Sequence, residues 1–151
     1  MKIIFDHFDA WWIKFRVVSD SVTYDVLGSA VLADPLTNLL RAVLLLNEGE
    51  PNIYAEFWEE PDSLIWHLEQ KDGKLFIHQY HEKDVLPKEN LRKELPRNAT
   101  FKSTIETDLN ILTQQVCDLF TYLWNEYGWE KYQEIWNHEF PLKEYKKLLN
   151  R

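Results

Sequence analysis

The sequence has little glycine, proline and cysteine, and it contains no long apolar run. Four Gly and six Pro in 151 residues argue against low-complexity disorder. The longest uncharged apolar run spans the five residues 42–46, whereas a membrane-spanning helix needs about 20. The N-terminal residues lack the layout of a signal peptide, and Cys117, as the single cysteine, excludes an internal disulfide. These absences predict a cytoplasmic globular protein with no membrane-spanning segment.

The length and composition predict one folded domain. A chain of 151 residues is close to the usual size of a domain, and its apolar share of 45% is typical of globular proteins. Aromatic residues are abundant, with seven Trp, seven Tyr and eight Phe. We therefore expect residues 1–151 to form a single domain, and the pattern of its elements predicts the α+β class.

Charge is distributed unevenly along the chain. Residues 1–82 contain 14 acidic and 6 basic residues, a balance of −8, whereas residues 83–151 contain 11 of each and are neutral overall. Binding to nucleic acid depends on neutralising phosphates with Lys and Arg, so the acidic half argues against a nucleic acid partner. The charge instead favours a basic protein partner, although an acidic surface can also serve solubility alone.

The first half of the chain predicts two strands and a helix. Residues 10–18 alternate between apolar and polar side chains, which is typical of a strand, and residues 22–27 predict a second one. Asp34 and Pro35 are favoured at the start of a helix, and leucine spacing continues that helix toward Gly49. One face of the first strand carries Trp11, Ile13, Phe15 and Val17, and the other carries Trp12, Lys14 and Arg16.

The rest of the chain predicts an antiparallel meander followed by helices. The meander covers residues 53–59, 64–70 and 74–82, with a type I′ hairpin signal at Asp72-Gly73. A charged connection over residues 83–102 leads to Ser103-Thr104-Ile105-Glu106, which matches a capping box and predicts a long helix as far as Gly128. Shorter helices are expected over residues 129–138 and after Pro141. The predicted fold is an antiparallel sheet of about four to five strands, packed with one helix of the N-terminal half and with C-terminal helices.

No catalytic or cofactor motif accompanies these elements. The chain has no G-x-S-x-G elbow, no glycine-rich phosphate loop and no H-E-x-x-H zinc pattern. Cys117 falls within an apolar helical stripe, where a thiol is unreactive. The sequence therefore predicts a protein that is not an enzyme and that uses neither a cofactor nor a metal.

One alternative is a metal-binding enzyme with three ligands in a row. A two-residue turn at residues 72–73 places His67 opposite His78, and a turn centred on residues 61–62 places Glu56 opposite His67. Three such side chains could hold a divalent metal, or they could form hydrogen bonds on a solvated sheet face. A shift of register would separate them.

The same register gives the meander a core face and a mixed face. The core face carries Ile53, Ala55, Phe57, Trp66, Leu68, Leu75 and Ile77. The opposite face combines aromatics with charges, as protein interfaces do, unless the C-terminal helices cover it. If the first strand joins this sheet, Trp12, Lys14 and Arg16 extend the mixed face. The predicted partner-binding residues are Tyr54, Glu56, Trp58, Glu59, Glu60, Asp62 and Tyr80.

Four short sequence segments, spread over most of the chain, resemble those of a known family. They are Asp9-Ala10-Trp11-Trp12, Gly28-Ser29-Ala30-Val31-Leu32-Ala33-Asp34-Pro35, Glu56-Phe57-Trp58-Glu59-Glu60-Pro61 and Glu139-Phe140-Pro141-Leu142. In this layout the chain resembles the small α+β immunity proteins that Gram-positive bacteria encode beside secreted polymorphic toxins. The resemblance implies a cytoplasmic protein that binds and blocks one cognate toxin domain, often a nuclease, without catalysis. It implies no particular site residues, because such families share no fixed binding motif.

Three functions therefore remain open at the level of the sequence. The leading hypothesis is a toxin-neutralising immunity protein whose partner is a basic toxin domain such as a nuclease. The second is a structural or regulatory interaction protein with another partner. The third is the metal-binding enzyme that would use Glu56, His67 and His78. None of these patterns predicts an oligomeric state.

Overall fold

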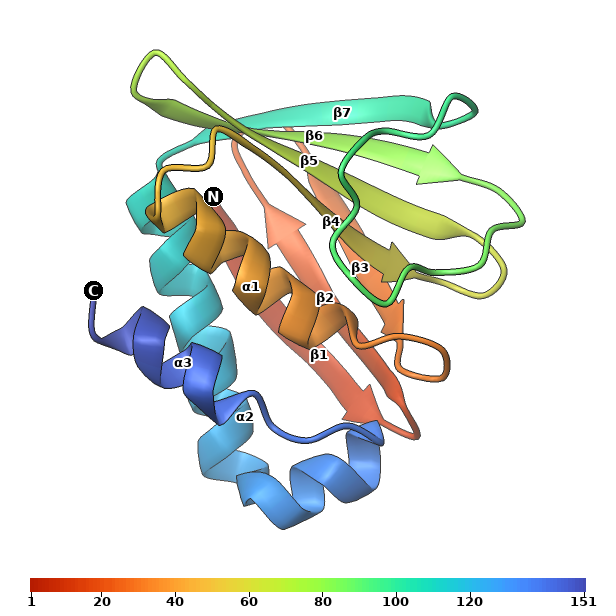
Figure 1. Cartoon of the computed structure of the whole chain (residues 1–151), viewed down its shortest axis with the longest axis vertical. Helices are drawn as coiled ribbons and strands as arrows, with labels where there is room; N and C mark the ends of the chain where they lie inside the picture. The colour runs from red at the N-terminus through yellow and green to blue at the C-terminus, as the bar shows by residue number, and fades with distance from the viewer.

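The computed structural model describes residues 1–151 and contains two antiparallel sheets and three helices (Figure 1). The first sheet has the order β1 (Lys2–Asp9), β2 (Trp12–Val18), β3 (Thr23–Ser29). The second has the order β4 (Asn52–Trp58), β5 (Ser63–Lys71), β6 (Lys74–Glu82), β7 (Thr100–Thr107). The helices are α1 (Pro35–Asn47), α2 (Leu109–Trp136) and α3 (Leu142–Leu149). The predicted α+β class is confirmed, but β2 belongs to a separate sheet and does not extend the mixed face of the meander.

Strand β1 is missing from the sequence prediction because a β-bulge interrupts its alternation. The register of β1 on β2 shifts between Phe5 and His7. Phe5 contacts Tyr122 of α2, with 4.8 Å between ring centroids, and Phe8 contacts Tyr127 at 5.1 Å. The inward positions are thus three residues apart instead of two. Trp11, which the alternation places in a strand on the same face as Ile13, lies instead in the turn between β1 and β2.

Helix α1 begins and packs as its sequence predicts. The Asp34 side chain caps the first turn by accepting a hydrogen bond from the Thr37 backbone N at 3.1 Å. The helix packs against β4 and β3, and the inner faces of the two sheets meet behind it. At the centre of this core the rings of Phe15, Phe57 and Trp66 contact one another edge to face.

The long C-terminal helix starts later than the capping-box pattern predicts. Residues 103–106 belong to β7 and pair with β6, and Ile105 is buried in the sheet core. Helix α2 begins after Asp108, and Gly128, at φ 63° and ψ −175°, separates its longer first part from a shorter second part, as predicted. None of the three helices has both the length and the apolar character needed to cross a bilayer.

The outer face of the four-stranded sheet is not covered by helices. Helix α2 packs on β1, and α3 packs on α1 and α2, on the other side of the molecule (Figure 1). The segment that links β6 to β7 along the chain, residues 83–99, contains no helix or named strand and crosses part of this outer face. We refer to this segment as the connection.

Candidate functional site

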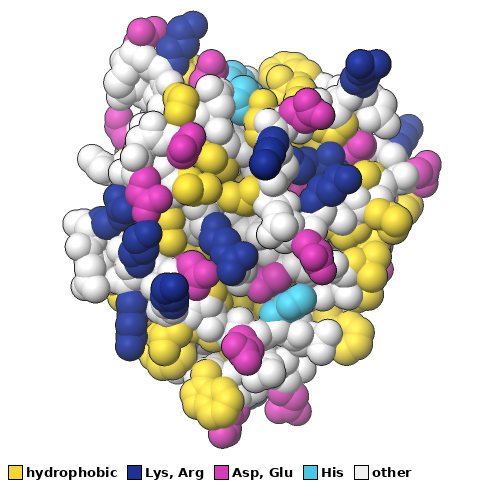
Figure 2. Space-filling view, viewed as in Figure 1, with side chains coloured by type: hydrophobic (Ala, Val, Ile, Leu, Met, Phe, Trp, Pro, Cys, Tyr) yellow, Lys and Arg dark blue, Asp and Glu magenta, His cyan; other side chains and the backbone are white.

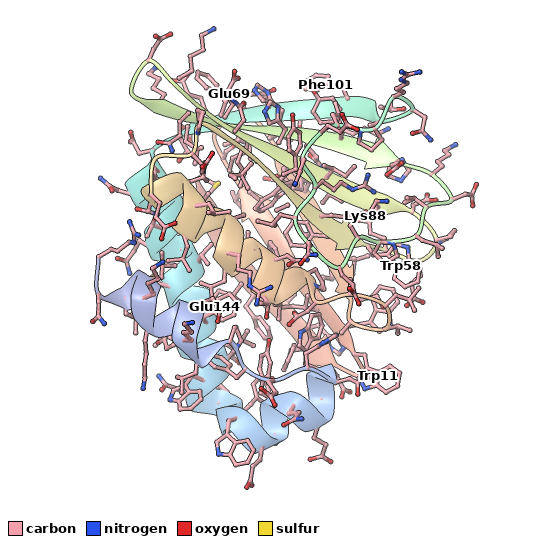
Figure 3. All side chains as sticks on the ribbon, in the orientation of Figure 1. Trp11, Trp58, Glu69, Lys88, Phe101 and Glu144 are labelled. Atoms are coloured by element: carbon pink, nitrogen blue, oxygen red, sulfur yellow. The ribbon has the colours of Figure 1, made fainter.

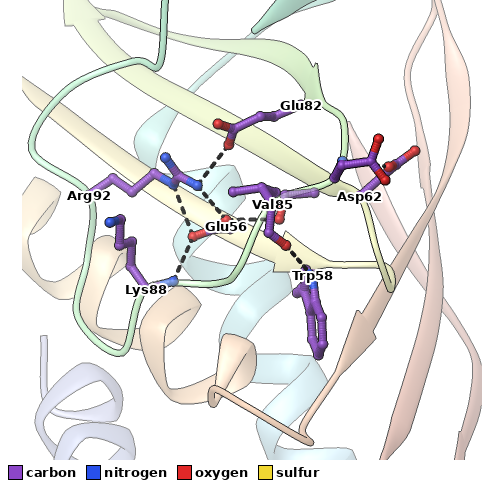
Figure 4. Close-up of polar contacts among 9 residues, drawn as sticks. Glu56, Trp58, Asp62, Glu82, Val85, Lys88 and Arg92 are labelled. Carbon is purple, nitrogen blue, oxygen red and sulfur yellow. Dashed lines mark hydrogen bonds and ion pairs between the residues drawn. The ribbon is translucent and has the colours of Figure 1, made fainter. Parts of the chain in front are cut away.

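Two of the predicted partner-binding residues, Glu56 and Trp58, are buried beneath the connection. The Trp58 indole Nε1 donates a hydrogen bond to the Val85 carbonyl at 2.9 Å, and 9% of the residue is exposed. The Glu56 carboxylate accepts hydrogen bonds from Ser63 Oγ at 2.8 Å and from the Lys88 backbone N at 3.2 Å (Figure 4). Both side chains therefore support the connection and are largely covered by it.

A buried ion-pair triad fastens the connection to the sheet. Nη2 of Arg92 lies 2.7 Å from Oε1 of Glu56 and 2.8 Å from Oε2 of Glu82 (Figure 4). Nε of Arg92 donates a further hydrogen bond to Glu56 at 2.9 Å. The three side chains are 7 or 8% exposed. Charges buried to this extent need partners, and Arg92 supplies the only Lys or Arg side chain that pairs with Glu56 and Glu82.

The predicted histidine row forms without Glu56. His67 lies opposite His78, as predicted, but the turn between β4 and β5 is centred one residue earlier than expected, so Tyr54 takes the place opposite His67. The Tyr54 ring stacks on His67 with 4.6 Å between centroids, and His78 Nε2 lies 3.0 Å from the Glu69 carboxylate. The three-ligand grouping is therefore wrong, and no cluster of His, Cys, Asp and Glu suited to a metal ion is present.

Tyr54 and Tyr80 lie on the outer face of the four-stranded sheet, beside the connection, whose Arg92 forms a backbone bridge with Tyr54. Tyr80 meets Phe101 of β7 edge to face, with 5.6 Å between ring centroids. Phe101 is 55% exposed, whereas both tyrosines are partly buried. The open part of this face is thus an aromatic surface on strands β4 to β7.

His67 should make this face sensitive to acid. Burial, followed by the neighbouring His78, lowers the pKa of His67 from its usual 6.5. A lowered histidine pKa means that the folded state favours the neutral ring, so its contribution to stability is complete above pH 6.5 and is lost as the pH falls through the folded pKa. We expect the wild-type Tm to fall between about pH 7 and 5, and the fall to be smaller in His67→Gln. Thermal melts at several pH values, with exposed His7→Gln as control, check this; equal falls in the wild type and His67→Gln would contradict it.

The predicted acidic residues lie in the loop between β4 and β5, at one end of the molecule. Glu59 is partly buried, and burial raises the pKa of its carboxyl group. Glu60 is exposed, and its Oε1 accepts a hydrogen bond from Ser29 Oγ at 2.5 Å. Asp62 lies 3.1 Å from the His81 ring. The bond from Ser29 places this loop beside the end of β3.

Three exposed apolar residues beside this loop are absent from the predicted partner-binding residues. Trp11, in the β1–β2 turn, is 42% exposed, and Val31 and Leu32, in the β3–α1 loop, are 43% and 49% exposed. The Ala30 backbone N donates to the Trp11 carbonyl at 2.9 Å, which joins the two loops. A turn was hard to foresee here, since the Ala10-Trp11 pair lacks the Gly or Asn typical of a two-residue hairpin. We call this surface the loop end; it comprises Asp9, Trp11, Val31, Leu32, Glu59 and Glu60.

The basic residues make their ion pairs away from the loop end. No Lys or Arg lies within 4.0 Å of the carboxylates of Asp9, Glu59 or Glu60. On the side that carries α1, α3 and the connection, acidic and basic side chains are interspersed (Figure 2). The loop end therefore carries negative charge without a basic partner from its own chain. The ion pairs of Lys and Arg are Lys14–Asp25, Arg16–Asp6, Arg41–Glu144, Lys74–Glu106, Arg92 with Glu56 and Glu82, and Lys147 and Arg151 with Glu48.

Comparison with known proteins identifies a structural relative. No protein-family model and no curated protein sequence matches the chain significantly. Among solved structures, a chain of the "CdiA-CT/CdiI toxin and immunity complex from Enterobacter cloacae" is similar, with a TM-score of 0.52 and 12% sequence identity. The match covers 79% of this chain and 97% of the other. This protein therefore shares its fold with a chain from a toxin and immunity complex.

Proposed function

We propose that this protein binds and neutralises a cognate toxin domain in the cytoplasm, without catalysing a reaction. The observation that carries the proposal is the fold shared with a chain of a toxin and immunity complex. The sequence resemblance to immunity proteins encoded beside polymorphic toxins supports the same function independently of the fold.

The proposed partner is a basic domain, such as a nuclease. A nuclease must hold phosphates and therefore carries Lys and Arg at its substrate site. This chain has a net charge of −8, and the carboxylates of the loop end have no basic partner within the chain. Opposite charges on two proteins speed their encounter and favour the correct partner.

A role without catalysis fits the state of the cysteine thiol. A thiol acts as a nucleophile in its ionised form. Cys117 is a free, buried cysteine, and burial raises the pKa of its thiol, which keeps the thiol protonated. A reduced, buried cysteine also suits the proposed cytoplasmic location.

The proposal predicts that this protein protects cells from the toxin domain encoded beside its gene. Expression of that domain alone should arrest growth, and co-expression with this protein should restore growth. The two purified proteins should also elute together in size-exclusion chromatography. Continued growth arrest together with separate elution would refute the proposal. Growth arrest caused by this protein alone would instead identify it as a toxin.

A further inference from the structure

The hairpin between β1 and β2 has an unfavourable residue at its tip. Asp9 pairs with Trp12, so Ala10 and Trp11 form a two-residue turn, and both have positive φ, at 49° and 67°. Such turns favour Gly, which has no Cβ atom, and Asn, whose short polar side chain can form local hydrogen bonds; other side chains are strained in this conformation. A bulky tryptophan there is a clear exception to the usual preference. Trp11 therefore occupies the tip in a backbone conformation that is strained for its side chain.

The backbone of Trp11 is held in place although its side chain is exposed. Its N–H donates to the Ile135 carbonyl at 2.9 Å, and its carbonyl accepts from the Ala30 N–H at 2.9 Å. The side chain lies at the edge of the molecule, on the same side as the β4–β5 loop (Figure 3), and 42% of the residue is exposed. An aromatic ring on a fixed backbone loses little conformational entropy when it binds, which is a property of strong interface anchors.

The neighbouring loops add apolar area and negative charge around this ring. Val31 and Leu32 are exposed next to Ala30, and the Val31 N–H donates to Ser29 Oγ at 3.3 Å. The same Ser29 hydroxyl donates to Glu60, as described above. Strain is also concentrated here, since four of the six non-glycine residues with positive φ lie in these loops or beside them. They are Ala10, Trp11, Glu60 and Asp84.

We propose that the loop end is the docking surface for a Lys- or Arg-bearing segment of the toxin partner, with Trp11 as its central anchor. This inference rests on the proposed function. A cation can lie over the exposed indole, where the face of the ring attracts positive charge, while Glu59 and Glu60 pair with further basic groups. Val31 and Leu32 supply the apolar contact that a stable interface needs at its centre.

The loop end suits a basic partner better than the open part of the sheet face does. On the sheet face, the Glu69 carboxylate is already paired with His78, and the Tyr54 ring is already stacked on His67. Glu59 is different: no Lys or Arg of the chain lies within 4.0 Å of its carboxylate. Burial raises the pKa of this carboxyl group, and a basic group of a partner would stabilise its charged form.

Replacement of Trp11 tests the proposal, because it should separate binding from stability. Trp11→Gly removes the ring and also relieves the positive φ, so the variant should remain folded, with a Tm within a few degrees of the wild type. Its Kd for the toxin domain should rise about 30-fold or more, as expected for a central anchor. Trp129→Ala is the matched control, because Trp129 is 59% exposed but lies on α2. That variant should bind within about twofold of the wild type, as variants outside an interface do.

Two further variants test the strain and the charges separately. Ala10→Gly relieves the neighbouring positive φ without touching the ring, so it should raise the Tm and leave binding unchanged. Glu59→Gln combined with Glu60→Gln should slow association about tenfold at low salt and reduce its dependence on ionic strength, with little effect on dissociation. Surface plasmon resonance at several salt concentrations measures both rates.

The outcomes distinguish this inference from the proposed function. If the toxin domain binds the wild type and Trp11→Gly equally well, the proposed function stands and the loop end is not the interface. A loss of binding in Tyr54→Ala or Tyr80→Ala would then place the interface on the outer sheet face. An octa-arginine peptide tests the surface without the toxin: at low salt it should shift the NMR signal of the Trp11 indole N–H, assigned by its loss in Trp11→Gly. Shifts confined to other tryptophans would overturn the inference.

Discussion

Replacing Arg92 with Met should lower the free energy of unfolding by about 3–5 kcal/mol, the range for breaking a buried ion pair. The change removes the guanidinium group that pairs with both Glu56 and Glu82 and leaves two carboxylates that are 7 or 8% exposed. Uncompensated charges at this depth repel each other and lack water, so the connection should detach from the sheet. Urea unfolding of the variant and the wild type measures the difference.

Two controls assign this loss to the buried charges. Arg97→Met removes an exposed arginine of the same connection that forms no ion pair, so it should change stability by less than about 0.5 kcal/mol. Combining Arg92→Met with Glu56→Gln and Glu82→Gln should recover much of the loss, because no charge then remains buried. A loss below about 1 kcal/mol for Arg92→Met would mean that water reaches the triad.

Replacing Leu112 with Ala should lower the free energy of unfolding by about 2–5 kcal/mol. Leu112 is fully buried on α2, within the main hydrophobic core. Truncation removes apolar contact and leaves a cavity that close-packed neighbours fill only in part. Thermal or urea unfolding measures the loss, which corresponds to a fall in Tm of roughly 4–20 °C for a domain of this size.

The adjacent residue provides a matched control for Leu112. Ile111 is 38% exposed on the same helical turn. Ile111→Ala loses less buried area and gains helix propensity, so its effect should stay within about 1 kcal/mol. Equal losses in the two variants would show that α2 does not bury the predicted face.

Elements with strong local signals could be predicted from the sequence. Asp34 and Pro35 start α1 where the residue preferences place it, because capping depends on atoms a few residues apart. Asp72-Gly73 produces the expected two-residue turn between β5 and β6, and the register of this pair is correct over its whole length. The predicted pairing of β4 with β5 differs from the observed one by two residues. A shift by two residues leaves each side chain on its own face of the sheet, so the alternation of the meander still separates the core face from the outer face.

Elements whose local pattern was ambiguous required the tertiary structure. The Ser103–Glu106 tetrapeptide fits a capping box, but it also contains the β-branched Thr104 and Ile105, and pairing with β6 makes it a strand. Strand β1 has a bulge that no local rule places, because the extra residue is defined by its pairing with β2. In both cases the deciding interaction is with a distant strand.

Part of the candidate site could likewise be predicted from the sequence, and part required the tertiary structure. Its acidic loop was predicted, since a cluster of carboxylates at a turn is visible in the sequence. The burial of Glu56 depends on Arg92, which is 36 residues away, and the burial of Trp58 depends on the Val85 carbonyl, 27 residues away. No spacing rule links such pairs, so Trp58 resembled an exposed anchor when only its strand was considered.

The sequence by itself determined the composition of the surface and core, the α+β class and the acidic character of the chain. Hydrophobic period, caps and turns act over a few residues, and therefore these features can be read locally. The tertiary structure decided which aromatic residue is exposed: it buries Trp58 under the connection and places Trp11 at a strained hairpin tip beside Val31 and Glu60. Exposure depends on which distant segments pack over a residue, and that packing reflects the free energy of the whole chain, not of any one segment.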